Sequence, residues 1–291
     1  MAATLSPPSD PLVSTEWLAA NLGRADLRLL DATWFLPDMK RDGRAEHGER
    51  RIPGAVFFDI DAVSDHGTAL PHMLPAPAAF AGAVGALGVG SGDTVVVYDA
   101  QGIWSGPRVW WMFRVFGHRD VFVLDGGLPR WLAEGRPVES GPPAAPAPRP
   151  FRAVYEPALV RGLEDMRAAV EAGAAQVVDA RSAARFAGTA PEPRPGLRSG
   201  HMPGARNLPF TQLIDPETKR MLPPDAILDR FAAAGADPAR PLVTSCGSGV
   251  TACVLALALE RAGRPGVPVY DGSWAEWGAG HVLPVETGPP R

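Results

Sequence analysis

The residue best suited to chemistry in this sequence is Cys246, which lies in the segment Pro241–Glu260 between two apolar runs. Gly247 and Gly249 allow backbone conformations that other residues resist, so successive N–H groups of the segment can converge on one point. A helix that begins directly after the loop would add unpaired N–H donors and the positive end of its dipole. These groups favour the thiolate, which is the reactive form of cysteine. The segment therefore predicts a nucleophile at Cys246.

Two other interpretations of this segment assign Cys246 a different role. A buried, inert cysteine in a glycine-rich turn is the structural one. A cysteine-dependent phosphatase also places its cysteine at a strand end, but its loop typically ends with an arginine that faces the phosphate. This chain has Val250 and Thr251 there, so attack on phosphorus is disfavoured. The second cysteine, Cys253, lies inside the apolar run, and we expect it to be a small core residue.

The elements that must position Cys246 are a strand and a helix of a parallel sheet. We expect a strand over Pro241–Ser245, a tight turn over Cys246–Thr251 and a helix from Val250 to Ala262. Short continuous apolar runs that alternate with helical patterns are typical of strands covered on both faces. In such sheets ligands bind beyond the carboxyl ends of the strands, which is where this loop would lie.

The chain repeats itself once, because four short segments recur in the same order at offsets of 146 to 150 residues. The pairs are Asp31 with Asp179, Ile52–Ala55 with Met202–Ala205, Val95–Asp99 with Leu242–Cys246, and Leu124–Trp131 with Tyr270–Trp277. We predict two homologous α/β domains, at residues 1–138 and 159–291, joined by a proline-rich linker over 139–158. Asp99 occupies the place of Cys246, so the first half lacks the nucleophile.

Composition and charge exclude several classes of protein. The 291 residues are 46% hydrophobic, which excludes a disordered chain, and two cysteines exclude a disulfide scaffold. The formal net charge of −4 predicts no nucleic-acid partner. The longest apolar run is Ala252–Leu259, far below the roughly 20 residues that span a bilayer, so we expect no membrane partner. The first residues lack the basic and apolar regions of a signal peptide, and we predict a cytoplasmic protein.

Several motifs resemble those of the rhodanese superfamily of sulfurtransferases in its tandem two-domain form. They are Phe57–Asp61, His72–Pro75, Pro107–Arg114, Leu124–Leu128, Gly200–Gly204 and Tyr270–Trp277. The loop Cys-Gly-Ser-Gly-Val-Thr is similar to that of 3-mercaptopyruvate sulfurtransferases, whereas thiosulfate-specific members tend to carry basic residues after the cysteine. The resemblance implies two rhodanese-like domains, each a central mainly parallel sheet flanked by helices. It also implies that the N-terminal domain is non-catalytic and the C-terminal domain catalytic.

The resemblance implies two substrate-binding arginines, which match Arg185 and Arg194. The carboxylate and ketone of a 2-oxo acid thiol suit such forked cationic donors, although two solvated loop arginines are the other interpretation. A relay of Ser248, His72 and Asp61 is implied as well, in which Asp61 orients the imidazole and His72 moves a proton. Packing between the domains is the other interpretation of His72.

Two further groups of side chains near these motifs have structural expectations. We expect His201 to fix the loop that follows the two arginines by hydrogen bonding. The tryptophans could line a cleft, but core packing is the expectation for most of Trp34, Trp104, Trp274 and Trp277.

The reaction implied by the resemblance is sulfur transfer from 3-mercaptopyruvate through a persulfide on Cys246, with release of pyruvate. The amides of Gly247, Gly249, Val250 and Thr251 would bind the sulfur, and a small thiol, a thioredoxin-like protein dithiol or cyanide would accept it. No cofactor or metal is expected, because no cysteine and histidine cluster has ligand spacing. Two alternatives stay open, namely thiosulfate:cyanide sulfurtransfer and a non-catalytic persulfide carrier. Arg185 and Arg194 argue against the carrier, since a relay needs no carboxylate clamp.

Overall fold

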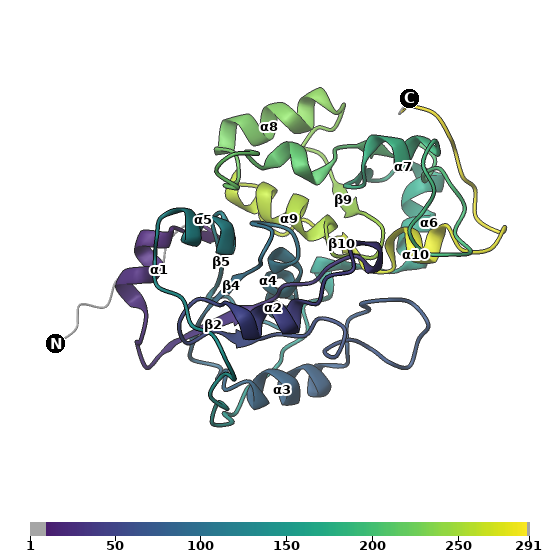
Figure 1. Ribbon diagram of the computed structural model, residues 1–291. Coiled ribbons are helices and arrows are strands. Elements are labelled where there is room, and N and C mark those ends of the chain that lie inside the picture. The colour runs from purple at the N-terminus through teal and green to yellow at the C-terminus, as the bar shows by residue number, and fades with distance from the viewer. Residues whose placement is uncertain (1–9, 290–291) are drawn as a thin grey trace.

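Two five-stranded parallel sheets form the framework of the computed structural model, which describes residues 10–289 (Figure 1). The strand order is β1-β5-β4-β2-β3 in the first sheet and β6-β10-β9-β7-β8 in the second. The first sheet contains β1 (Leu12–Val13), β2 (Leu27–Asp31), β3 (Val56–Phe57), β4 (Thr94–Tyr98) and β5 (Val121–Leu124). The second contains β6 (Val160–Arg161), β7 (Gln176–Asp179), β8 (Arg206–Asn207), β9 (Leu242–Ser245) and β10 (Val269–Tyr270). The predicted α/β fold of two similar domains is confirmed.

Helices connect the strands and cover the sheets. The first domain has α1 (Thr15–Asn21), α2 (Gly43–Glu49), α3 (Pro77–Ala86), α4 (Gly106–Val115) and α5 (Gly127–Ala133). The second has α6 (Leu163–Ala172), α7 (Ala183–Ala187), α8 (Pro224–Ala233), α9 (Ala252–Arg261) and α10 (Ser273–Trp277). Short 3₁₀ turns lie at Pro37–Met39, Pro157–Leu159 and Phe210–Leu213. No helix within residues 10–289 is long and apolar enough to span a membrane.

The central strand β9 forms because its four residues are buried on both faces of the sheet. It pairs with β7 in parallel, with Asp179 opposite Ser245, and β10 lies on its other side. The strand agrees with the predicted Pro241–Ser245 to within one residue. The helix begins at Ala252 rather than at Val250, because Gly249 at φ +74° takes the chain out of the helical path before it.

The proline-rich segment lies along the first domain. Its Glu139 forms an isolated bridge with Arg51, and the Arg149 N–H donates to the Gly85 carbonyl at 2.9 Å. The Arg149 guanidinium is also paired with the buried Asp93 at 2.5 Å. These contacts bind the segment to one domain, and the predicted boundaries at 138 and 159 remain predictions.

The two domains share one apolar core where α4 packs against α9 (Figure 1). Val109 and Phe113 of α4 and Leu255 and Leu259 of α9 are all fully buried in the same cluster. Apolar burial of this kind is the main source of favourable folding free energy, so neither domain completes its core alone.

Each domain also places a loop on the other, and the two contacts mirror one another. The Leu74 N–H donates to Asp271 Oδ2 at 2.8 Å, and the Met221 N–H donates to Asp125 Oδ1 at 2.9 Å. Two residues before each donor lies a non-glycine residue with positive φ, His72 at +63° and Lys219 at +61°. The internal repeat of the sequence therefore extends to the way the domains exchange loops.

Candidate active site

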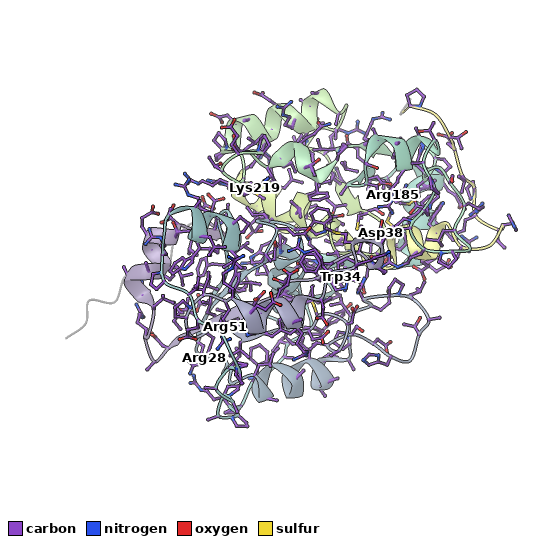
Figure 2. All side chains as sticks on the ribbon, viewed as in Figure 1. Arg28, Trp34, Asp38, Arg51, Arg185 and Lys219 are labelled. Carbon is purple, nitrogen blue, oxygen red and sulfur yellow. The ribbon has the colours of Figure 1, made fainter. Side chains whose placement is uncertain are left out.

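Cys246 follows β9 directly and lines a cavity of about 290 Å³ that is formed by residues of both domains. It is only 1% exposed. The second domain contributes Arg185, Arg194 and most of the Cys246 loop to the cavity wall. The first domain contributes an apolar side formed by Trp34, Leu36 and Trp104. Figure 2 shows Trp34 and Arg185 on the two domains at their junction.

The loop from Cys246 to Thr251 is held from outside by hydrogen bonds to its backbone. The N–H groups of Cys246 and Gly249 donate to Ser273 Oγ at 3.2 and 3.0 Å, and Ser273 Oγ donates to the Tyr270 carbonyl. Gly247, Ser248, Val250 and Thr251 line the cavity, whereas the Gly249 N–H is used by Ser273. The buried hydroxyl therefore fixes the turn, and its role was not anticipated from the sequence.

The corresponding loop of the first domain holds an anion supplied by the chain itself. The carboxylate of Asp99, which replaces Cys246, is fully buried. It accepts hydrogen bonds of 2.8 to 3.0 Å from the backbone N–H groups of Gln101, Trp104, Ser105 and Gly106. This loop shape, placed between a strand and a helix, is therefore able to surround a negative charge with amides.

Arg185 and Arg194 both reach the cavity near Cys246. A Cβ atom built on Gly247 would lie 2.8 Å from Arg185 Nη2, so this guanidinium lies against the loop. Arg185 Nη2 and Nε donate to Glu192 at 2.6 and 3.2 Å. The structure thus brings both predicted arginines to the cysteine, with one of them oriented by a buried carboxylate.

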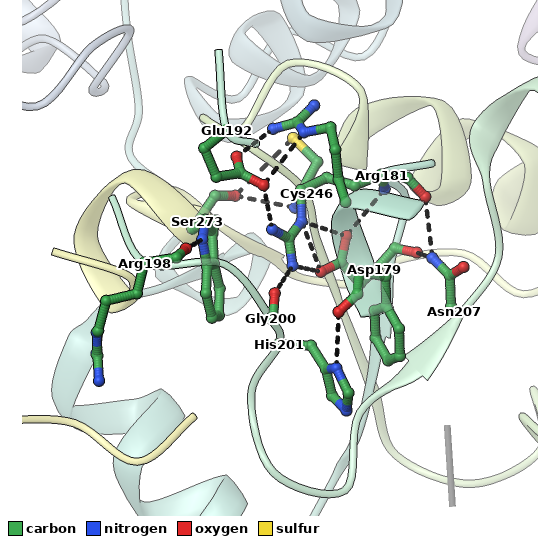
Figure 3. A network of polar contacts seen from close by, with 12 residues as sticks. Asp179, Arg181, Glu192, Arg198, Gly200, His201, Asn207, Cys246 and Ser273 are labelled. Atoms are coloured by element: carbon green, nitrogen blue, oxygen red, sulfur yellow. Dashed lines mark hydrogen bonds and ion pairs between the residues drawn. The ribbon is translucent and has the colours of Figure 1, made fainter. Parts of the chain in front are cut away.

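Glu192 belongs to a buried ionic network behind the cavity (Figure 3). It accepts from Arg181 Nη1 at 2.8 Å, and Arg181 Nη2 donates to Asp179 at 2.6 Å at the end of β7. Arg181 also lies over the Trp274 ring, 4.4 Å from its centre. Breaking a buried pair of this kind is costly, because it leaves an uncompensated charge. The network therefore fixes the position of Arg185, and sequence reasoning missed it.

His72 and Asp61 are brought together, but the far side of the imidazole faces Arg194. His72 Nδ1 lies 2.9 Å from Asp61 Oδ1, although its N–H is not well aligned on that oxygen. His72 Nε2 lies 3.0 Å from Arg194 Nη2. Ser248 lines the Cys246 cavity, whereas His72 and Asp61 lie behind Arg194 and are not among its lining residues. Within residues 10–289 no hydrogen bond joins Ser248 to His72. Two members of the predicted relay are therefore in contact, and Arg194 stands where the third was expected.

The protonation state of His72 follows from its surroundings. Burial lowers the pKa of His72, and the nearby cations Arg108 and Arg194 act in the same direction against Asp61. The close contact with the His72 ring, 2.9 Å from Asp61 Oδ1, lowers the pKa of Asp61. Because a guanidinium can only donate, Nε2 must accept from Arg194, which places the imidazole proton on Nδ1. The ring is therefore neutral near pH 7.

The remaining candidate side chains divide into core and cavity positions. Cys253 is fully buried, its Sγ donates to the Gly249 carbonyl at 3.2 Å, and burial raises the pKa of its thiol. His201 is buried with Nδ1 at 2.8 Å from the Phe186 carbonyl, consistent with its expected structural role. Trp274 and Trp277 are buried as expected, whereas Trp34 and Trp104 line the cavity. Trp34 also donates to Asp61 Oδ2 at 2.9 Å.

Both halves of the chain match the family model described as a rhodanese-like domain, over residues 14–134 and 163–279. The chain belongs to the rhodanese family. It is 49% identical to the 3-mercaptopyruvate sulfurtransferase of Homo sapiens, with 91% of each chain covered. It is 44% identical to the thiosulfate sulfurtransferase of Bos taurus, with 95% of this chain and 94% of the relative covered.

A solved structure of the rhodanese fold agrees with this assignment. The crystal structure of a 3-mercaptopyruvate sulfotransferase from Escherichia coli superimposes with a TM-score of 0.83 at 39% identity, and 92% of this chain and 100% of that chain are covered. In this member of the rhodanese family, the residues that sequence reasoning missed are Glu192, Arg181 and Ser273. The repeated Asp-Gly motif at Asp271 was the one available signal for Ser273.

Proposed function

We propose that this protein is a sulfurtransferase that takes sulfur from 3-mercaptopyruvate, holds it as a persulfide on Cys246 and releases pyruvate. One observation carries the proposal. Cys246, in the loop after β9 of a rhodanese-like domain, lines a cavity together with the guanidinium groups of Arg185 and Arg194. The names of the human and Escherichia coli relatives, which are 49% and 44% identical, support the choice of donor.

The donor binds through its carboxylate and ketone. Arg185 and Arg194 supply forked donors for these two groups, and Glu192 holds Arg185 in place. Arg194 lies between the cavity and His72 Nε2. When the carboxylate engages Arg194, this guanidinium leaves His72 Nε2, whose lone pair then faces the donor. Substrate binding thereby prepares the proton acceptor.

Sulfur is then transferred from the donor carbon to Cys246. The thiolate of Cys246 attacks the sulfur of the donor, an S–S bond forms, and the C–S bond breaks with its electron pair on carbon. The carbon fragment leaves as the enolate of pyruvate. His72 Nε2 accepts the proton of the donor thiol and returns it to the enolate carbon, while Asp61 stabilises the imidazolium between these steps.

The persulfide is stabilised by backbone amides. The counterparts of Gln101, Trp104 and Ser105, which bind the Asp99 carboxylate, are Ser248, Thr251 and Ala252 at an offset of 147 residues. Their N–H groups, together with those of Gly247 and Val250, form the positive environment for the terminal sulfur. The acceptor, a small thiol, a thioredoxin-like dithiol or cyanide, then removes that sulfur.

Thiosulfate is the second candidate donor. The bovine relative is named for thiosulfate, and an Arabidopsis thaliana relative that is 46% identical is named for both thiosulfate and 3-mercaptopyruvate. The uncharged Gly247 and Ser248 provide no cation for a dianion next to the cysteine. The arginine pair also disfavours a non-catalytic carrier. The cytoplasmic location remains a prediction, since that plant relative is named as mitochondrial.

Steady-state rates with both donors and intact mass spectrometry of the donor-treated protein test the proposal. We expect 3-mercaptopyruvate to give the higher kcat/KM, and the protein to gain one sulfur atom when no acceptor is present. A wide preference for thiosulfate would overturn the choice of donor. No gain of sulfur from either donor would overturn the enzymatic proposal.

A further inference from the structure

Arg108 is a fully buried arginine of α4, in the domain that lacks the nucleophile. Its Nη1 donates to Asp271 Oδ1 at 2.7 Å and to the Gly249 carbonyl at 3.3 Å. Its Nη2 donates to the His72 carbonyl. A buried charge is costly unless it is paired and hydrogen-bonded, so a single side chain is fixed here to three partners.

The three partners belong to separate parts of the active site. Gly249 is the turn of the Cys246 loop, Asp271 follows β10, and His72 is the imidazole that Arg194 contacts. Two of them come from the second domain and one from the first. Arg108 is therefore the point where the loop of the nucleophile and the backbone of the histidine are held together.

We propose that Arg108 is a positioning residue that keeps the Gly249–Val250 peptide in the orientation needed to hold the persulfide. Gly249 has φ +74°, where glycine is free of steric penalty, so the peptide that follows it can turn over unless its carbonyl is held. Ser273 holds the preceding peptide through the Gly249 N–H. Arg108 holds the Gly249–Val250 peptide itself through the Gly249 carbonyl, which also accepts from Cys253 Sγ.

The consequence for the sulfur follows from the planarity of the peptide. In a trans peptide the carbonyl and the following N–H point in opposite directions. With the Gly249 carbonyl on Arg108, the Val250 N–H points away from that guanidinium, and Val250 lines the cavity. Reversal of the peptide would replace this N–H by a carbonyl oxygen, which repels a negatively charged sulfur.

The first domain shows why only one loop needs this support. The residue that corresponds to Arg108 at an offset of 147 is Leu255, which is apolar and buried in the core. The loop of the first domain is held instead by its own Asp99 carboxylate, which binds four amides. The loop of Cys246 must keep its amides available for substrate, so its orientation depends on contacts at its outer side.

Arg108 also supports the backbone at His72. That residue adopts φ +63°, which is uncommon for residues other than glycine. The hydrogen bond from Arg108 to the His72 carbonyl and the contact of the Leu74 N–H with Asp271 fix the two sides of this turn. Loss of Arg108 is therefore expected to affect the proton carrier together with the loop.

The mirrored contact at the other end of the interface provides a matched control. Asp125 accepts from the Met221 N–H and from Arg220 Nε, both at 2.9 Å, as Asp271 accepts from the Leu74 N–H and from Arg108. Asp125→Asn and Asp271→Asn therefore make the same change at equivalent positions, and only Asp271 is linked to the Cys246 loop.

The experiment compares Arg108→Lys, Asp271→Asn and Asp125→Asn in the full chain with 3-mercaptopyruvate as donor. Lysine keeps the charge but lacks the fork that reaches three acceptors. We expect kcat to fall at least about tenfold for Arg108→Lys and Asp271→Asn, since small displacements at a reacting centre are costly. KM should change by less than about threefold, because Arg185 and Arg194 are untouched. Asp125→Asn should keep kcat within about twofold of the wild type.

A second measurement follows the stored sulfur directly. Protein loaded with donor and freed of it should lose the added sulfur atom faster in Arg108→Lys than in the wild type, as intact mass shows over time. A wild-type kcat and persulfide lifetime in Arg108→Lys would overturn the inference, and so would an equal loss of kcat in Asp125→Asn. If Arg108→Lys does not fold, the same two measurements are made on Asp271→Asn. A wild-type kcat and persulfide lifetime in that variant would overturn the inference.

The inference rests on the proposed function, and the two fail differently. Wild-type protein that gains no sulfur contradicts the proposed function, whatever the variants do. If the wild-type protein gains sulfur and Arg108→Lys shows the same kcat and persulfide lifetime, only the proposed role of Arg108 is contradicted.

Discussion

The two thiols of this chain lie on one loop and helix, and their surroundings give them different chemistry. Cys246 opens into the cavity beside Arg185 and Arg194, whereas Cys253 is enclosed by the core and donates to the Gly249 carbonyl. Burial raises the pKa of Cys253, so this side chain stays a neutral thiol. Because both residues are cysteines, we expect access to the cavity and the nearby arginines to determine which sulfur reacts.

Substitution of the two cysteines separates these roles. Cys246→Ser should abolish the gain of sulfur and reduce transfer at least about a thousandfold, because the hydroxyl is a far weaker nucleophile. Cys253→Ser keeps a donor for the Gly249 carbonyl and should retain kcat within about twofold. Intact mass and steady-state rates measure both variants. Turnover retained by Cys246→Ser would show that another residue is the nucleophile.

The pH dependence of the reaction tests the role of Asp61. Burial lowers the pKa of His72, and Asp61 opposes that shift, so Asp61→Asn should lower the pKa of His72 further. The neutral imidazole then persists to more acidic solution, and the acidic limb of kcat/KM moves to lower pH. We also expect kcat to fall roughly tenfold or more, because the imidazolium loses its counter-charge. A limb that moves to higher pH in this variant would contradict the assignment of His72 as proton acceptor.

At the scale of the element, the turn at Gly249 is the tightest point of the loop between β9 and α9. A Cβ atom there would lie 2.7 Å from the Asp271 carbonyl and 2.9 Å from Arg108 Nη1. Gly266 has nearly the same backbone, at φ +77°, but its Cβ would meet no atom within 4 Å. An alanine at either position would therefore adopt the same unfavourable φ, but only the alanine at Gly249 would also collide with neighbouring atoms.

Alanine substitution at these two glycines separates strain from collision. Gly266→Ala should lower the free energy of unfolding by about 1 kcal/mol and leave transfer unchanged. Gly249→Ala should in addition displace the loop and lower kcat more than about tenfold. Thermal unfolding and donor kinetics on both proteins measure the difference. Equal kcat values for the two variants would mean that the turn does not control the reaction.

Sequence patterns predicted the elements of the second domain well where apolar runs define them. The strand that precedes Cys246 was placed to within one residue, because four consecutive buried residues have few alternatives to a central strand. The start of α9 was placed two residues early, since Val250 and Thr251 belong to a turn that Gly249 and Ser273 set. A side chain that holds a loop from a distant helix, as Ser273 does from the start of α10, leaves no signal within the loop sequence.

At the scale of the whole molecule, α4 and α9 join the two sheets through a common core. We therefore expect one cooperative unfolding transition in calorimetry, although separate domains often unfold separately. Leu255→Ala, on the fully buried face of α9, should lower the free energy of unfolding by about 2 to 5 kcal/mol and keep that transition single. Two resolved transitions in the wild type would contradict a shared core.

The grouping of Cys246 with the two arginines was predictable from the sequence, but their partners across the domains were not. Cys246, Arg185 and Arg194 lie in short motifs, and the structure places all three at one cavity. Arg108 contacts Gly249, 141 residues away, and sequence spacing carries no information about such a pair. For the same reason Arg194 was not expected beside His72.

The depth of Cys246 has a consequence for the molecules that exchange sulfur with it. Because the residue is only 1% exposed, we expect its partners to present a slender group, such as a thiol on a small molecule or on a protruding protein loop. Broad surfaces are kept at a distance from the sulfur of Cys246. Under the proposed function, we therefore expect the persulfide form of the protein to persist after the donor product leaves, so that donor and acceptor need never be bound together.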